Sequence, residues 1–346
     1  MKVLMAACSR QGYEWMKRLD SEWEAGGDTV TTVCLTKCKS LPDISIQGSL
    51  RDRIGEWFGK VDAVVFFCAV GIAVRMIAPY LHHKSVDPAV VVMDEAGKFC
   101  IPILSGHMGG ANELAEKIAG RFGAVPVITT ATDRENKFSV DDFARKNKLA
   151  ITSWELVKEI SADILEGSYI KMDSEYPVEG ECPEEVLLSA GLTGEGRICI
   201  SPHVLTGRYT ERVLQLIPKW YVVGIGCRKG TTKEQIAEAV ETFLGEEGIL
   251  PEAVESLASI DLKNEEKGLL GFCREKGLPF LTYPAKVLQS AEGDFSESAF
   301  VEQVTGVSCV CERSAVTAAQ GKLLCRKRIY DGVTVALAVK KGSITF

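Results

Sequence analysis

The feature that most constrains the fold is an uninterrupted apolar run from Ala63 to Cys68. A strand without a polar face suits the centre of a parallel sheet that helices cover on both sides. Around this run, strand-like and amphipathic helical segments alternate along the chain. The strand-like segments are 2–8, 29–35, 89–93 and 99–104, and the helical ones include 11–24, 50–59 and 111–122. The alternation predicts an α/β protein that begins with a Rossmann-like parallel sheet.

The pattern changes twice along the chain, which predicts a multi-domain protein. Residues 1–137 are expected to form the N-terminal α/β domain. Residues 138–218 are less regular, with Glu and Pro concentrated around 175–185, and are interpreted as a small α+β middle domain. From Trp220 the alternation restarts, so residues 219–346 are predicted to form a C-terminal three-layer α/β/α domain with a mixed sheet.

Composition argues against several classes of function. The 346 residues are 46% hydrophobic and 25% charged, which is typical of a globular protein with ample core. A net charge of −7 argues against general binding to nucleic acid or to a membrane surface. No apolar run approaches the ~18 residues that span a bilayer. The opening segment Met1–Cys8 is too short for a signal peptide and is interpreted as a strand.

The twelve cysteines are scattered and include no Cys-x-x-Cys pair. The closest spacings, Cys34–Cys38 and Cys309–Cys311, have no histidine nearby, so the sequence predicts no metal site. Cysteines within apolar runs behave as small core residues. Scattered cysteines that serve as core residues favour a reducing, cytoplasmic location.

A glycine-rich loop at residues 105–113, Ser-Gly-His-Met-Gly-Gly-Ala-Asn-Glu, carries the strongest chemical signal. It leads into the helix predicted at 111–122, with Asn112 as the expected N-cap and Glu113 in the first turn. Because glycines leave the turn uncovered, backbone N–H groups and the His107 imidazole are expected to face an anionic ligand. The candidate ligand-binding residues are Ser105, Gly106, Gly109, Gly110 and Asn112. The alternative is a tight turn with one exposed histidine.

Two further loops of the N-terminal half are expected at the same edge of the sheet. Gly71 and Arg75 follow the apolar strand, and Thr129, Thr130 and Asp133 follow a strand at 125–128. In an open α/β sheet, ligands bind beyond the carboxyl ends of the strands. The alternatives are an exposed helical arginine for Arg75 and helix capping for the threonines and Asp133.

The C-terminal half contains a second donor-rich turn between a strand and a helix. Its candidate binding residues are Gly224, Gly226, Cys227, Arg228, Lys229, Gly230, Thr231 and Thr232. The turn departs from both Gly-x-Gly-x-x-Gly and the P-loop order, so a nucleotide site is poorly supported. Asp261 and Lys263 follow the next strand. Glu312 is either an acid of the site or a favourable carboxylate at a helix N-terminus.

From the residues alone, the chain is expected to bind a polyanionic small molecule. Arg75, Arg228 and Lys229 supply positive charge, and His107 is the best acid–base candidate because an imidazole titrates near neutral pH. A Gly-x-Ser-x-Gly nucleophile elbow is absent, which disfavours serine hydrolase chemistry.

Several long motifs, in order along the chain, resemble those of the CbiG family of the anaerobic cobalamin pathway. They are Gly71–Arg75, Ser105–Ala115, Thr129–Asp133, Gly224–Thr232, Ala258–Lys263 and Gly332–Ala338. The resemblance implies opening of the ring A δ-lactone of cobalt-precorrin-5A, with the extruded meso carbon released as acetaldehyde to give cobalt-precorrin-5B. It implies no protein-bound cofactor, because the substrate carries the cobalt. One departure is Ser308–Glu312, where two cysteines enter a segment that is usually simpler in the family.

A mechanistic hypothesis follows from these residue types. His107 acts as general base on water that attacks the lactone carbonyl, and Glu113 or Asp133 orients the imidazole or manages a second proton. Backbone N–H groups of residues 106–110 stabilise the oxyanion. Alternatively, His107 only contacts cobalt or a propionate.

A competing class is a non-catalytic tetrapyrrole carrier, because the C-terminal domain also resembles a stand-alone tetrapyrrole-binding protein of the aerobic pathway. A nicotinamide or S-adenosylmethionine enzyme is disfavoured, since Asp261 is the only tempting ribose ligand. The expected partner is the tetrapyrrole substrate. Transfer contacts with neighbouring pathway enzymes and a homodimer stay open.

Overall fold

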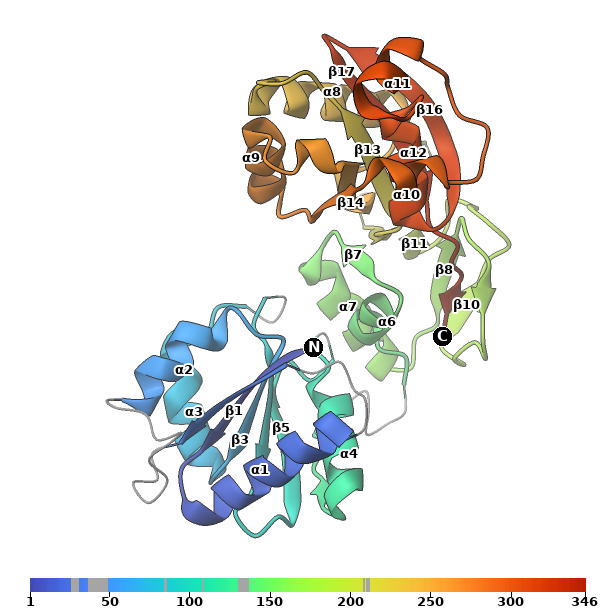
Figure 1. The fold of residues 1–346 in the computed structure, drawn as a ribbon. Helices are drawn as coiled ribbons and strands as arrows, with labels where there is room; N and C mark the ends of the chain where they lie inside the picture. The colour runs from blue at the N-terminus through green and yellow to red at the C-terminus, as the bar shows by residue number, and fades with distance from the viewer. Residues whose placement is uncertain are drawn as a thin grey trace. The chain divides into compact units, whose positions relative to one another are not determined.

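The computed structural model describes residues 1–25, 31–36, 49–83, 86–107, 109–129, 137–207, 209 and 212–346. The chain forms two compact units, residues 1–145 and residues 146–346, shown in Figure 1. Thr130 and Asp133 lie outside the described residues.

In the first unit, the described strands form one sheet of order β2-β1-β3-β4-β5-β6. The strands are β1 (Lys2–Ala7), β2 (Thr31–Thr36), β3 (Ala63–Phe67), β4 (Ala89–Met93), β5 (Phe99–Leu104) and β6 (Val125–Pro126). The helices are α1 (Arg10–Ala25), α2 (Leu50–Phe58), α3 (Val70–Ile77), α4 (Ala111–Phe122) and α6 (Val140–Lys146), with a 3₁₀ turn at Ala78–Tyr80.

Helices cover both faces of this sheet, as the apolar run 63–68 predicts. Val65 and Phe67 pack with α1 and α4 on one face. Val64 and Phe66 pack with α2 and α3 on the other (Figure 1). The residues of β1, β3 and β4 that form these two clusters are fully or almost fully buried. The period of two in the strands therefore divides one sheet between two cores.

The prediction of a parallel N-terminal sheet is wrong at its last two strands. β1 to β4 are parallel, but β5 pairs antiparallel with β4, and β6 runs parallel to β5. Only residues 94–98 separate β4 from β5, and a parallel crossover needs about a dozen residues. Asp94 closes this hairpin by accepting the N–H groups of Lys98 and Phe99, both at 2.7 Å.

The antiparallel β5 changes where the predicted loops lie. Its carboxyl end reaches the edge where β1, β3 and β4 begin, so the 105–110 loop lies at that edge. Gly71 lies at the opposite edge, where β3 ends and α3 begins. The expectation that all three loops share one edge is therefore wrong for Gly71. It holds for Thr129, because β6 runs in the same direction as β5.

The second unit contains two larger mixed sheets among its described residues. The first has the order β10-β8-β11-β12-β7 and is parallel except for β7. Its elements are β7 (Leu149–Ile151), α7 (Trp154–Leu165), β8 (Ile170–Ser174), β10 (Val186–Leu188), β11 (Ile198–Ile200) and β12 (Leu214–Pro218). Strand β9 (Val178–Glu179) pairs with the last strand of the chain, β18 (Ile344–Thr345).

The other sheet has the order β15-β14-β13-β17-β16 and is mixed, as predicted for this region. Its strands are β13 (Tyr221–Gly226), β14 (Val254–Ile260), β15 (Phe280–Tyr283), β16 (Lys322–Tyr330) and β17 (Val333–Val339). The helices are α8 (Lys233–Glu246), α9 (Lys267–Lys276), α10 (Ala285–Gln289), α11 (Ala299–Thr305) and α12 (Val310–Ala319), with 3₁₀ turns at Pro251–Ala253 and Asp261–Lys263. Helices α8 and α9 lie on one face, and α10 to α12 lie on the other (Figure 1).

Gly224 allows α12 to approach this sheet closely. A Cβ atom at position 224 would lie 1.8 Å from the backbone oxygen of Cys311 and 2.8 Å from the Cβ of Ala315. We expect Gly224→Ala to lower the free energy of unfolding by about 2 kcal/mol, because the helix must move to admit the methyl group. Thermal unfolding checks this. Gly245→Ala in α8, where nothing lies within 4 Å of the added Cβ, is the matched control. Equal stability of the two variants would contradict the packing role.

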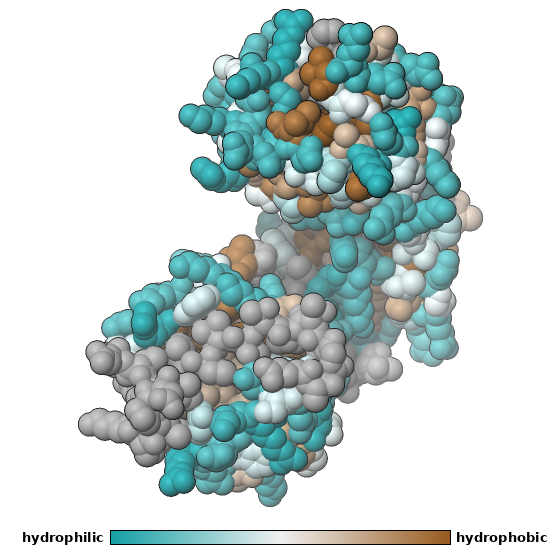
Figure 2. Space-filling view, viewed as in Figure 1, coloured by the Kyte–Doolittle hydropathy of each residue, from teal (hydrophilic) through white to brown (hydrophobic). Residues whose placement is uncertain are grey.

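The surface is mostly hydrophilic on the described residues of each unit that Figure 2 shows, and apolar side chains appear in small groups. No helix among the described residues combines the length and the apolar composition needed to span a bilayer.

Candidate functional site

In the loop that follows β5, the described residues on either side of His107 make defined backbone contacts. Ser105 adopts a positive φ of 55° and Gly110 one of 78°, so the chain turns sharply on both sides of the histidine. The N–H of Gly110 donates to the carbonyl of His107 at 2.9 Å, and that of Ala111 donates to Ser105 at 3.2 Å. The Ser105 hydroxyl donates to the carbonyl of Asp87, just before β4, at 3.0 Å. These bonds hold the loop against the edge of the sheet.

Asn112 is not the N-cap that the sequence suggests. Helix α4 begins at Ala111, and Gly110 is its N-cap, with no side-chain capping bond. The Asn112 side chain instead lies over Gly106, where a Cβ atom would be only 2.8 Å from the amide oxygen. The N–H of Asn112 also donates to the carbonyl of Gly106 at 3.1 Å. Asn112 therefore supports the loop from within the first turn of the helix.

A carboxylate faces His107, and it comes from a part of the chain to which the sequence assigns no chemistry. The Nδ1 atom of His107 lies 3.7 Å from Oδ1 of Asp141 in α6. The two side chains are 15% and 14% exposed, so both are largely shielded from water. The Ser139 hydroxyl donates to the same Asp141 oxygen at 2.8 Å and helps to fix it. A carboxylate next to an imidazole is the arrangement that orients a histidine as a general base.

Glu113 is engaged elsewhere. Its carboxylate accepts a hydrogen bond from Nη2 of Arg145 at 2.5 Å, and the same nitrogen donates to Asp142 at 2.8 Å. Burial by itself would lower the pKa of the Arg145 guanidinium, but the hydrogen bonds to the two carboxylates raise it overall. Arg145 thus ties α6 to the first turn of α4. This arrangement gives Glu113 a positioning contact with α6.

The remaining predicted residues of this unit occupy two places. Thr129 follows β6 toward the edge of the His107 loop. Arg75 lies in α3, where its Nη1 donates to the carbonyl of Gly71 at 2.9 Å, so its charge covers the first turn of its own helix. Gly71 and Arg75 therefore fit the alternative of a surface helical segment.

A second cluster forms in the other unit, where β13 and β14 end side by side. Among the predicted residues it gathers the 227–232 loop with Asp261 and Lys263. The N–H of Gly230 donates to Glu266 at 3.0 Å, and Lys263 lies 3.4 Å from the same carboxylate. Burial raises the pKa of the Cys227 thiol, although nearby Lys263 opposes this effect.

Individual residues of this loop have structural reasons for their identity. Thr232 caps α8 in a capping box with Gln235. The Thr231 hydroxyl donates to the carbonyl of Arg228 at 2.9 Å. A Cβ at Gly226 would lie 2.6 Å from the Thr334 hydroxyl oxygen. Arg228 and Lys229 are exposed at the tip of the turn, where they can meet an anion.

Glu312 is fully buried, and its carboxylate is occupied by the protein. It accepts the N–H and the hydroxyl of Ser296 at 2.6 and 2.8 Å, and the N–H of Lys327 at 2.7 Å. Burial alone would raise the pKa of this carboxyl, but these donors hold it below its usual value. The carboxylate joins α12 to the loop before α11 and to strand β16, which corresponds to a structural role.

The residues that sequence reasoning missed are Asp141, Asp142 and Arg145. Their one visible signal is the acidic pair after Ser139, which resembles an ordinary helix start. These residues pair with His107 and Glu113 across more than thirty positions of the chain. A contact over that separation produces no periodic pattern in the sequence.

Comparison with known proteins covers almost the whole chain. The sequence profile described as "Cobalamin synthesis G N-terminal" matches residues 52–133. "Cobalamin biosynthesis central region" matches residues 138–218, and "Cobalamin synthesis G C-terminus" matches residues 221–338.

Two relatives that match most of this chain share one name. A protein of Salmonella typhimurium named cobalt-precorrin-5A hydrolase is 32% identical over 305 residues, which is 86% of this chain and 87% of the relative. One of Priestia megaterium with the same name is 31% identical over 313 residues, covering 86% and 80% of the two chains. "Protein CobE" of a Sinorhizobium species is 28% identical over 120 residues, 34% of this chain and 78% of that protein. With matches that extend over both units, the chain belongs to the CbiG family of cobalamin biosynthesis proteins.

Proposed function

We propose that this protein is a cobalt-precorrin-5A hydrolase, which opens the ring A δ-lactone and releases the extruded meso carbon as acetaldehyde. The observation that carries the proposal is the largely shielded His107–Asp141 pair at the entry to α4. The full-length relatives named for this reaction support the same activity. A pure carrier would have no need of an imidazole oriented by a carboxylate.

In the proposed mechanism, His107 removes a proton from the water that attacks the lactone carbonyl. Asp141 is a positioning residue, because its carboxylate lies 3.7 Å from Nδ1 and stabilises the imidazolium that forms. The positive end of the α4 dipole lies next to the loop and favours the oxyanion. Collapse of the ring-opened alkoxide then forms the C=O bond of acetaldehyde and breaks the carbon–carbon bond to the macrocycle. The electron pair of that bond stays with the conjugated macrocycle, and acetaldehyde leaves.

The assignment of roles differs from the hypothesis based on sequence. Glu113 is bound to Arg145, so Asp141 replaces it as the group that orients the imidazole. The N–H of Gly110 donates to the carbonyl of His107 within the loop, so it is not assigned to the oxyanion.

The direct test supplies the full chain with cobalt-precorrin-5A made in situ and measures acetaldehyde with alcohol dehydrogenase and NADH. We expect one acetaldehyde per substrate consumed. Tight binding of the tetrapyrrole without acetaldehyde would overturn the proposal and place the protein among carriers.

The role of Asp141 is tested by Asp141→Asn. We expect kcat to fall roughly tenfold or more with little change in KM, because the amide no longer stabilises the imidazolium. The acidic limb of the pH–rate profile, where the base becomes protonated, is expected to change as well, and Asp141→Glu should restore part of the rate. The control is Glu116→Gln, which removes an exposed carboxylate of α4. An unaltered pH profile in Asp141→Asn would contradict the positioning role.

A further inference from the structure

The second unit contains a cavity that the proposed mechanism does not use. Its volume is about 500 Å³, within the range of small-molecule sites. Its lining combines the titratable pair Glu175 and His203 with hydroxyl groups, glycines and apolar side chains. The other lining residues are Leu192, Thr193, Gly194, Ser201, Val204, Leu205, Thr206, Gly207 and Tyr209.

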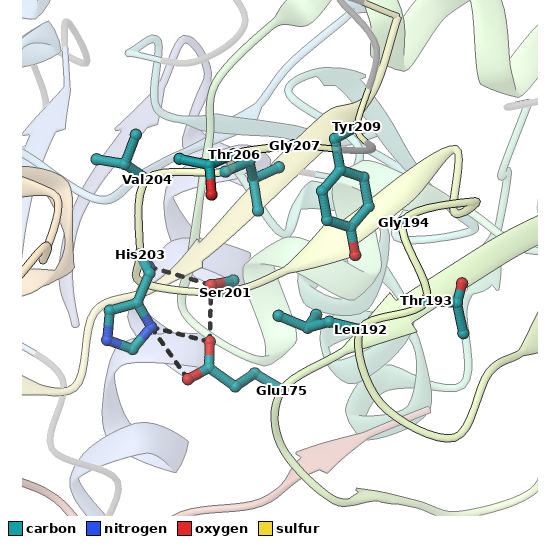
Figure 3. A pocket seen from close by; sticks show the side chains of 11 residues that line it. Glu175, Leu192, Thr193, Gly194, Ser201, His203, Val204, Thr206, Gly207 and Tyr209 are labelled. Carbon is teal, nitrogen blue, oxygen red and sulfur yellow. Dashed lines mark hydrogen bonds and ion pairs between the residues drawn. The ribbon is translucent and has the colours of Figure 1, made fainter.

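The imidazole of His203 is held in place by Glu175. Its Nδ1 atom lies 3.0 Å from both carboxylate oxygens. The hydroxyl of the fully buried Ser201 donates to the same carboxylate at 2.7 Å and accepts the N–H of His203 at 3.1 Å. Figure 3 shows these three residues gathered together, with Leu192, Val204, Thr206 and Tyr209 around the rest of the cavity.

Buried groups behind the lining fix this arrangement further. Gln215 donates to the carbonyls of Ser201 and His203 at 3.0 and 2.8 Å. Tyr209 donates to the buried Asp173 at 2.7 Å. The N–H groups of Thr193 and Gly194 donate to that same carboxylate at 2.9 Å. The polar groups are therefore preorganised before any ligand arrives.

The geometry selects the chemistry of the ligand. With Glu175 at Nδ1, a neutral His203 offers a lone pair at Nε2, and a protonated one offers an N–H. A hydroxyl group satisfies both forms because it donates and accepts. A carboxylate would be repelled by the carboxylate of Glu175, which lines the cavity beside His203. Leu192, Val204 and Leu205 supply contacts for an apolar body.

We propose that this cavity is a second small-molecule site, which binds an uncharged compound with a hydroxyl group hydrogen-bonded to His203 and an apolar part against Leu192 and Val204. The inference uses no residue of the His107 site and does not depend on the proposed hydrolase activity.

Two probes of equal size test it: benzyl alcohol and benzoate. The chain has only four histidines, so the imidazole signals of the full-length protein labelled with ¹³C and ¹⁵N in histidine can be assigned with His203→Gln. We expect benzyl alcohol to shift the His203 signal saturably, and to bind at least tenfold more tightly than benzoate. The signals of the other three histidines should not move.

Two variants make the test specific. Val204→Trp fills the cavity at an exposed position and should abolish the shift while the thermal unfolding midpoint is unchanged. Glu175→Gln should weaken binding of benzyl alcohol several-fold and reduce the preference over benzoate. The proposal is overturned if neither probe shifts His203 saturably, if benzoate binds as tightly as the alcohol, or if the Val204→Trp protein responds as the wild type does.

Discussion

Acetaldehyde release by the His107→Ala protein is expected to be 10²- to 10⁴-fold slower than by the wild type, which is the range that a general base contributes. The imidazole is the only group of the 105–110 loop whose ordinary pKa lies near neutrality. Its removal leaves the helix dipole and the substrate contacts in place, so KM should change little. The measurement is kcat and KM for acetaldehyde formation with substrate made in situ.

The control for this prediction is His83→Ala, which removes an exposed histidine and should retain the wild-type rate. Binding of the tetrapyrrole, followed by its absorbance, should persist in His107→Ala. If both variants release acetaldehyde at the wild-type rate, His107 is not the base. A large rise in KM with an unchanged kcat would instead assign His107 to substrate binding, as in the alternative that it contacts cobalt or a propionate.

The second large effect is on stability, and it concerns Asp173 in β8. This carboxylate is fully buried and accepts hydrogen bonds from the Tyr209 hydroxyl and from the N–H groups of Thr193 and Gly194. Asp173→Asn places an NH₂ group against these donors and removes the charge. We expect the free energy of unfolding to fall by roughly 3 kcal/mol or more, because buried donors lose their acceptor.

The pH dependence of stability checks the same residue. Burial would raise the pKa of Asp173, but its hydrogen-bond donors outweigh this and lower it from 3.8 to about 2. The ionised carboxylate therefore contributes roughly 2 kcal/mol above pH 4, and this contribution is lost as the pH falls through 2. Between pH 4 and 2, the wild type should lose more stability than Asp173→Asn.

The matched control is Asp163→Asn, which removes a half-exposed carboxylate paired with Arg197. A loss of less than about 1 kcal/mol is expected there. Amide hydrogen exchange at residues 193–196 gives a local readout, and faster exchange is expected only in Asp173→Asn. Equal stability of the two variants would show that the network around Asp173 contributes little.

Much of the local structure could be predicted from the sequence. The structure confirms the predicted strands 89–93 and 99–104 and the predicted helix 111–122, because the apolar residues of each segment follow one clear period. Strand β16 was not predicted. It lies at the sheet edge, and its charged, half-exposed sequence hides the alternation.

The direction of β5 was also missed, although the short 94–98 turn contains the information, since a five-residue connection cannot return a strand to the parallel direction. This single reversal moves Gly71 away from the His107 loop.

Local periodicity and the placement of glycines indicate most of the elements, the two buried faces of the N-terminal sheet and the loop that carries His107. Which groups meet at that loop depends on tertiary packing. It brought Asp141 to His107, Arg145 to Glu113 and the Ser296 hydroxyl to Glu312. Hydrogen bonds between residues far apart in the chain depend on how helices and sheets pack, and no local pattern records that packing.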